Sequence, residues 1–224
     1  MTNFMSRKDS QIRLNIDDIF NENGYINNNN DINNKYGYNQ CVKKITLYRT
    51  KTTPIKIGDD FLYACTKLTE LYTFEITNII SIGTHFLSSC FQLEKLDTRG
   101  FKNVQYIGCY FLYDCQNLTE LDTSNFPEIR FIDHNFCANC IKLESFNTSG
   151  LSHLRSIQND FLYNCNSLKK IDTSAFLNVK TIGNNFLYCC INLEIFDISK
   201  FQKLEIINEN AFDCCIKLDK NSKF

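Results

Sequence analysis

Thiols and imidazoles are the side chains of this chain with the clearest chemical potential. It holds twelve cysteines and three histidines, His85, His134 and His153. His134 lies three residues before Cys137, and a neighbouring imidazole can activate a thiolate for nucleophilic catalysis. No oxyanion-donor motif or third orienting group accompanies this pair, and the three histidines occupy different phases of the repeat described below. The sequence therefore predicts no catalytic residues and no enzyme, with a thiol-dependent enzyme as the minor alternative.

Two double cysteines raise the question of a metal. Cys189–Cys190 and Cys214–Cys215 bring four sulfurs into neighbouring copies of the repeat. Zinc ligands normally come as Cys-x₂₋₄-Cys pairs that converge tetrahedrally, whereas adjacent side chains diverge on a helix or strand. We predict no metal site and no cofactor, and a metal-dependent enzyme stays a second minor alternative.

A third set of candidate residues is polar and recurs every 25 residues or so. Asp or Asn dominates this column, which precedes Thr and often Ser, and it is flanked by charged residues. Its carboxylates either shape the turn that follows each strand, through local hydrogen bonds, or form the acidic centre of a concave binding face. The candidate binding residues are Tyr72, Lys95, Asp97, Arg99, Glu120, Asp122, Asn147, Lys170, Asp172 and Asp197.

A tyrosine column offers a second candidate surface, on the opposite, convex side. Tyrosine is favoured at interfaces because its large amphipathic ring buries area with little loss of entropy. The alternative is that the rings only lean over the edge of each coil. The column comprises Tyr63, Tyr113, Tyr163 and Tyr188, interrupted by Ser88 and Ala138.

All these residues are positioned by one internal repeat. Seven cysteines recur every 25 residues without an insertion or deletion, and columns of Ile, Phe and Leu keep the same phase. A self-similar unit of this length predicts a solenoid in which each copy buries its apolar face only by stacking on the next. The cysteines are Cys65, Cys90, Cys115, Cys140, Cys165, Cys190 and Cys215.

Each repeat predicts one strand and one short helical turn. The run Leu118–Phe126 alternates apolar and polar residues, with Leu118 and Leu121 pointing inward, so stacked copies should form a parallel sheet. The run Ile107–Cys115 places Phe111 and Cys115 one helical turn apart, which favours a short helix or 3₁₀ turn. Gly83 and its equivalents would open that turn, where a positive φ or a close approach is needed.

The repeat resembles the BspA-like leucine-rich repeat family over residues 54–221. The runs that carry the resemblance are Ile182-Gly-Asn-Asn-Phe-Leu-Tyr-Cys-Cys-Ile-Asn-Leu-Glu and Ile157-Gln-Asn-Asp-Phe-Leu-Tyr-Asn-Cys-Asn-Ser-Leu-Lys. The resemblance implies an α/β repeat fold: a right-handed leucine-rich-repeat solenoid with parallel strands on one face and short helical or 3₁₀ turns on the other. It also implies protein binding or adhesion, since many relatives are microbial surface proteins.

Two regions follow from this pattern. Residues 1–40 are rich in Asn and poor in apolar residues, which predicts a flexible arm; the alternative is a short docking helix over Ile12–Phe20. Residues 41–224 form the solenoid, with an N-terminal half repeat around Val42–Leu47 and seven 25-residue repeats. Asn221 replaces the apolar residue of its column, which predicts a capping role.

Charge and hydropathy exclude several classes of partner. The formal net charge of −1 and the absence of a Lys/Arg run argue against nucleic acid or an anionic membrane. The first twenty residues lack the apolar core of a signal peptide, and no stretch approaches the roughly 18 apolar residues of a membrane span. We expect a cytoplasmic protein with reduced cysteines and a protein partner. The alternative is a surface adhesin exported by an unconventional route, and the sequence indicates no oligomeric state.

Overall fold

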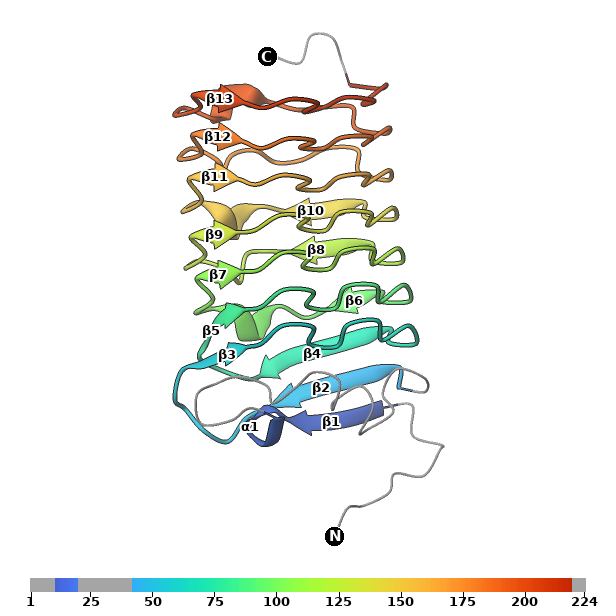
Figure 1. Cartoon of the computed structure of the whole chain (residues 1–224), viewed down its shortest axis with the longest axis vertical. Helices are drawn as coiled ribbons and strands as arrows, with labels where there is room; N and C mark the ends of the chain where they lie inside the picture. Colours follow the sequence, from blue (N-terminus) through green and yellow to red (C-terminus); the bar gives the residue numbers. More distant parts are fainter. Residues whose placement is uncertain (1–10, 20–41, 219–224) are drawn as a thin grey trace.

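A computed structural model describes residues 11–19 and 42–218, which form a single stack of coils (Figure 1). Short parallel strands and brief 3₁₀ segments recur along the stack, with one short helix near its start. The elements are β1 Gln11–Asn15, α1 Ile16–Ile19, β2 Lys44–Tyr48, β3 Ile55–Ile57, β4 Glu70–Glu75, β5 Ile79–Ile82, β6 Lys95–Leu96, η1 Arg99–Phe101, β7 Tyr106–Ile107, β8 Glu120–Asp122, β9 Phe131–Ile132, β10 Ser145–Asn147, η2 Ser149–Leu151, β11 Ser156–Ile157, β12 Thr181–Ile182, η3 Ile198–Lys200 and β13 Ile206–Ile207.

The predicted strand of each repeat is present and forms the strand face, a parallel ladder along one side of the stack. Strands β1, β2, β4 and β6 pair in that order, and β8 and β10 continue the ladder. The register keeps each column in line, because Leu71 pairs with Leu96 and Leu121 pairs with Phe146. The predicted fold class, a leucine-rich-repeat solenoid, is confirmed.

The second half of each repeat differs from the helical turn that the sequence predicts. The conserved-phase isoleucines lie in a second parallel ladder instead, formed by β3, β5, β7 and β9 and continued by β11, β12 and β13. The 3₁₀ segments lie elsewhere, after the strand face, at η1, η2 and η3. The prediction was wrong here because one-turn spacing of Phe and Cys also fits a chain that alternates between right- and left-handed residues.

That alternation occupies the segment after each isoleucine. In the coil of Ile107, Tyr110, Leu112 and Asp114 have φ of 60°, 56° and 60°. Left-handed conformations cost non-glycine residues about 1–2 kcal/mol each. Their amides donate in turn to the next coil, the preceding coil and the next coil, at 2.9, 3.0 and 2.8 Å. These bonds exist only between stacked coils, so a single repeat has nothing to offset the strain.

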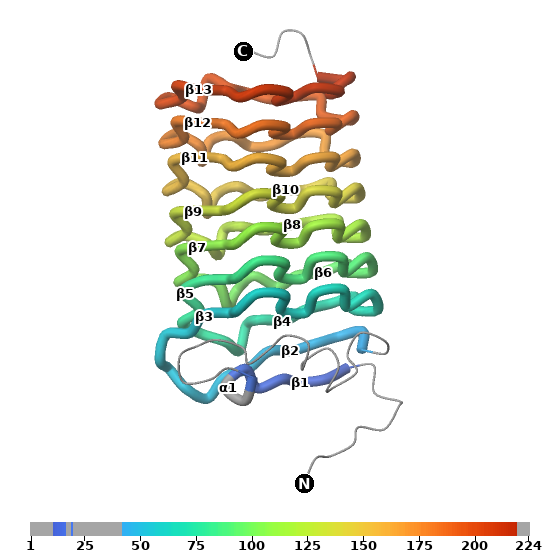
Figure 2. The backbone as a smooth tube through the Cα atoms, viewed as in Figure 1, coloured from blue at the N-terminus to red at the C-terminus, as the bar shows by residue number. Residues whose placement is uncertain are grey.

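Stacked side-chain columns fill the space between the two ladders (Figure 2). Phe86, Phe111 and Phe136 stack face to face, with ring centroids 5.3 and 5.2 Å apart. A buried threonine column lies nearer the strand face, where the Oγ1 of Thr148, for example, donates to the carbonyl of Asp172 at 2.6 Å. Apolar burial and these polar ladders therefore repeat with the same period as the sequence.

The repeat glycines are required for close approach, one of the two reasons anticipated. A Cβ on Gly108 would lie 2.8 Å from the backbone carbon of Gly83, and a Cβ on Gly183 would lie 2.7 Å from the amide nitrogen of Asn159. Neither glycine has a positive φ. Their role is to let adjacent coils touch through the backbone.

Both ends of the stack add to the expected picture. Residues 11–19 depart from the predicted flexible arm, because β1 pairs with β2 along its whole length and Ile12 and Ile16 are buried. The docking segment proposed for Ile12–Phe20 is thus mainly a strand, which completes the first coil. The rest of the predicted arm, and Asn221, lie outside the described residues. In the segments that the structure describes, no helix is long and apolar enough to cross a membrane.

Candidate interaction surface

The Asp/Asn column lies at the end of each strand on the strand face, and its side chains make mainly local hydrogen bonds. Asp122 Oδ1 accepts from the amide of Ser124 at 2.9 Å and from Nδ2 of Asn147 at 2.8 Å. Asp172 and Asp197 accept from the amides two residues later, each at 2.9 Å. This geometry fits the turn-shaping interpretation. Asp122, Asn147 and Asp172 are nevertheless exposed, so the column also contributes surface charge.

Asp97 differs from the other members because it is buried. Its Oδ2 accepts from the amides of Thr73 and Phe74 in the preceding coil, at 3.1 and 3.0 Å. Its Oδ1 accepts from Nε of Arg99 at 2.7 Å. Burial would raise the pKa of Asp97, but hydrogen bonds from Arg99 and Thr73 outweigh it and lower that pKa. Asp97 is therefore a charged anchor for two coils and not a free contact residue.

Arg99 is the outward end of this network. Its guanidinium lies over the ring of Phe74, 4.9 Å from the centroid, while Asp97 holds it through Nε and Nη2. The Phe74 residue is 47% exposed. A large apolar ring and an oriented guanidinium thus share one exposed spot on the strand face.

Tyr72 and Lys95 extend the same spot. Lys95 Nζ lies 5.6 Å from the centroid of the Tyr72 ring, and the Tyr72 ring packs edge-on against Phe74 at 6.2 Å. The Tyr72 hydroxyl donates to Glu70, which also pairs with Lys44 at 2.6 Å. Hydrogen bonds from Lys44 and Tyr72 lower the pKa of Glu70. We call Tyr72, Phe74, Lys95 and Arg99 the aromatic–cation patch.

The remaining predicted residues are not part of this patch. Glu120 and Lys170 are exposed on later coils of the strand face, and Lys170 forms an isolated bridge with Ile195. Asn147 Oδ1 accepts from the amide of Ser149 at 3.0 Å. The ten predicted residues therefore share one face, but only Tyr72, Lys95, Asp97 and Arg99 contact one another as a cluster.

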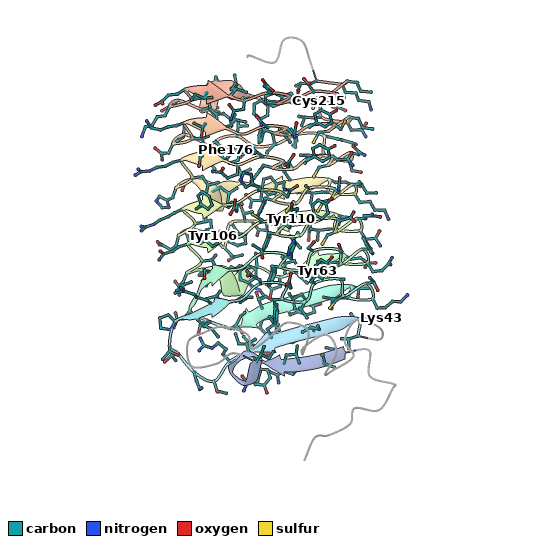
Figure 3. The ribbon with its side chains drawn as sticks, in the orientation of Figure 1. Lys43, Tyr63, Tyr106, Tyr110, Phe176 and Cys215 are labelled. Atoms are coloured by element: carbon teal, nitrogen blue, oxygen red, sulfur yellow. The ribbon has the colours of Figure 1, made fainter. Side chains whose placement is uncertain are left out.

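The tyrosine column is present but interrupted. Tyr163 and Tyr188 stack with centroids 5.1 Å apart, and both are half-buried. Tyr63 contacts His85, which stacks on Tyr110 at 4.8 Å. Figure 3 shows Tyr63 and Tyr110 on the turns between the two ladders. Much of each ring is covered by neighbouring rings, which fits the interpretation that they lean over the coil edge.

The sites considered for thiol chemistry lack activation. Cys137 is fully buried, and burial raises the pKa of its thiol well above the usual range. His134 is half-exposed, and its Nδ1 accepts from the amide of Asn159 at 3.2 Å. Among the described residues, no three His, Cys, Asp or Glu side chains converge to hold a metal ion.

Two surface features escaped the sequence analysis. Phe74 belongs to a longer strand, β4, whose outward position has no aromatic equivalent in later repeats, so the column gave no signal. The expectation that Lys and Arg do not cluster is wrong in one place, because Arg130, Arg155 and Lys180 are each 25 residues apart and stack into one column. Reading outward columns for charge, as was done for Asp, would have found it.

Comparison with known proteins agrees with this architecture. The chain matches the family model for the BspA type leucine rich repeat region, in six copies, over residues 30–151 and 130–222. Among solved structures, it is similar to the leucine rich repeat protein TpLRR of T. pallidum, with 14% identity, a TM-score of 0.46 and coverage of 80% of this chain and 79% of that one.

A leucine rich cell surface protein of Faecalibacterium prausnitzii A2-165 is also similar, with 14% identity, a TM-score of 0.18 and coverage of 76% of this chain and 77% of that one. Curated proteins give no match. At these TM-scores the fold assignment depends on the ladders and the family model. With that model spanning most of its length, and with the Ile, Phe, Cys and Leu columns stacked in register, the chain belongs to the BspA type leucine-rich repeat family.

Proposed function

We propose that this chain is a non-enzymatic protein–protein interaction module that binds its partner on the strand face, centred on the aromatic–cation patch. The observation that carries the proposal is the contact of the Arg99 guanidinium with the exposed ring of Phe74, 4.9 Å from its centroid. Aromatic residues and arginine are enriched at the energetic centres of protein interfaces. The family supports a role in protein interaction or as a surface repeat protein.

The patch is favourable for binding because its side chains are already ordered. Asp97 holds Arg99 through two guanidinium nitrogens, so little rotamer entropy remains to be lost when a partner docks. Phe74 offers apolar area, and the surrounding strand face is flat and polar. The exposed carboxylates of Asp122 and Asp172, farther along the face, would form the rim and steer association more than they hold the complex.

Catalysis is the less favoured function. Burial raises the pKa values of Cys90, Cys115 and Cys165 as well as that of Cys137, so these sulfurs stay protonated and unreactive. We propose that the chain works without a metal or cofactor. Metal content and the thiol reactivity of purified protein would separate this from a thiol- or metal-dependent enzyme.

Binding is tested by quantitative capture on immobilised full chain. The variants are Phe74→Ala and Arg99→Ala, and the matched control is Tyr106→Ala, which removes an exposed aromatic ring from the other ladder. Proteins that bind through the patch should be depleted by about tenfold or more in both variants, because truncating a central contact costs roughly 2 kcal/mol. An unchanged set of captured proteins, with each variant folded, would refute the strand-face site.

The location of the protein is a separate proposal. We propose a cytoplasmic module, and the alternative is a surface adhesin. Cell fractionation together with protease shaving of intact cells separates the two. Loss of the full-length band on shaving, with an intact cytosolic control protein, would support the adhesin.

A further inference from the structure

A groove on the opposite ladder is lined by an unbalanced column of cations. Arg130, Arg155 and Lys180 directly precede β9, β11 and β12, which lie one above another on the same side of the stack (Figure 1). Adjacent strands lie about 4.8 Å apart, so the three cations are stacked at roughly that spacing. All three side chains belong to exposed residues.

The column is not neutralised by the protein. Neither the Arg130 nor the Arg155 guanidinium has a hydrogen bond or ion pair with any described residue, whereas Lys180 pairs with Glu205 at 2.7 Å. The strand face behaves differently, since Lys44, Glu70 and Lys95 alternate in sign along one column. Like charges about 4–5 Å apart repel by on the order of 1 kcal/mol even in water. The arginine column is therefore a local excess of positive charge in a chain whose net charge is −1.

The shape at this place is concave. The groove has a volume of about 1030 Å³ and also contains His153, Lys203 and Glu128. Its wall is held by contacts between coils: His153 Nδ1 lies 2.9 Å from the carbonyl oxygen of Pro127, and Lys203 Nζ donates to Asn178 at 2.7 Å. The free guanidiniums thus project from an ordered wall.

We propose that this groove binds an acidic segment of a partner protein in an extended conformation. A guanidinium binds a carboxylate with two parallel hydrogen bonds. In an extended chain, side chains at alternate residues lie on the same side, about 6.6 Å apart. Long arginine side chains can span the difference from the coil spacing, so the expected motif has carboxylates at every second residue. This groove is distinct from the strand-face patch, and either site can fail without the other.

The observations favour an acidic peptide over nucleic acid. Glu128 lies in the groove and Glu205 at its edge, and both would repel a continuous phosphate backbone. A nucleic-acid site also normally needs a broader basic surface than three stacked cations. Carboxylates on a short segment can avoid the two glutamates by register.

The test is fluorescence anisotropy of a labelled Glu-Ser-Glu-Ser-Glu-Ser peptide with the full chain, at low salt and at about 0.15 M ionic strength, where the Debye length is about 8 Å. The Arg130→Gln/Arg155→Gln double variant should weaken binding by about tenfold or more, because both bidentate contacts are lost. The matched control, Lys67→Gln/Lys169→Gln, removes the same charge at exposed positions outside the groove and should bind as the wild type does.

Three results would overturn the proposal. One is equal weakening by the two double variants, which would indicate an effect of net charge alone. Another is equal affinity for a peptide in which Gln replaces Glu. The third is tighter binding of a single-stranded oligonucleotide of equal charge that is abolished in the arginine variant, which would assign the groove to nucleic acid. Folding is checked by thermal melting, where the arginine variant should match or exceed the wild type because repulsion is relieved.

Discussion

The thiol of Cys140 lies 3.2 Å from the backbone carbonyl oxygen of Leu112, in the preceding coil. The same contact recurs along the stack: Cys90 Sγ donates to Leu62, and Cys190 Sγ to Leu162, at 3.1 and 3.2 Å. A cysteine fits here because it is small and apolar and still offers a weak donor. The invariant spacing of cysteines is thus explained by packing and by a hydrogen bond between coils, without disulfides or metal.

Replacing Cys140 by Ala should destabilise the protein moderately. The change removes a buried sulfur and its hydrogen bond, although Leu112 keeps a weaker contact with the amide of Cys115. We expect a loss of about 1–2 kcal/mol in the free energy of unfolding, measured by urea denaturation. Cys109→Ala, at a partly exposed cysteine outside the column, is the control and should cost less. Equal costs would show that the ladder contact adds nothing.

Thiol reagents should label the native protein in an order set by exposure. Cys214 is exposed and should react first, followed by Cys109 and Cys189, which are partly buried and whose thiol pKa values are raised chiefly by burial. The six buried periodic cysteines should react only on unfolding. Mass spectrometry of timed iodoacetamide reactions measures the order, and prompt labelling of Cys115 or Cys140 would be inconsistent with the packed ladder. Cys41 lies outside the described residues.

Truncation of Leu121 tests coupling between coils. Its side chain is buried between the coils of Leu96 and Phe146, so Leu121→Ala should cost about 2–5 kcal/mol through lost burial and a cavity. Neighbour coupling should spread the effect to both adjoining coils, visible as faster amide exchange at their strands. Glu120→Ala, the exposed neighbour, should stay within about 0.5 kcal/mol. A local effect confined to one coil would contradict the stacked model.

Asp97 should make stability depend on pH at the acid end. Its folded pKa is lowered from 3.8, so the unfolded chain takes up the proton first as the pH falls. The stabilisation is therefore complete above that value and disappears as the pH drops through the folded pKa. At neutral pH, Asp97→Asn should cost about 1 kcal/mol, discounted because Arg99 is in solvent. The gap between wild type and variant should close below pH 3.8; Asp122→Asn, at an exposed carboxylate, should show no such closing.

Periodicity allowed the strand face, the core columns and the buried cysteines to be predicted, because burial repeats with the sequence. The second ladder was missed, since alternating left-handed residues such as Leu112 leave no compositional signal when no glycine or asparagine is required there. Order at Ile12 and Ile16 was missed because their partner strand lies about thirty residues away.

The site was predicted only as a face. The Asp column predicted which side chains share it, but the burial of Asp97 and the ring of Phe74 depend on how one particular coil is built. The arginine column was within reach of the same periodic argument, since its members keep the 25-residue phase. Its concave setting depends on contacts between loops and was not.

The central claim, that the strand face binds a partner through the aromatic–cation patch, is tested most directly by hydrogen–deuterium exchange of the full chain with and without a captured partner. The claim predicts protection over Glu70–Glu75 and around Lys95–Arg99, with no change in β7 and β9. Because Phe74 and Arg99 lie at the proposed centre, the Phe74→Ala variant should lose that protection at the same partner concentration. Protection confined to the opposite ladder, or an unchanged strand face in a complex that has formed, would contradict it.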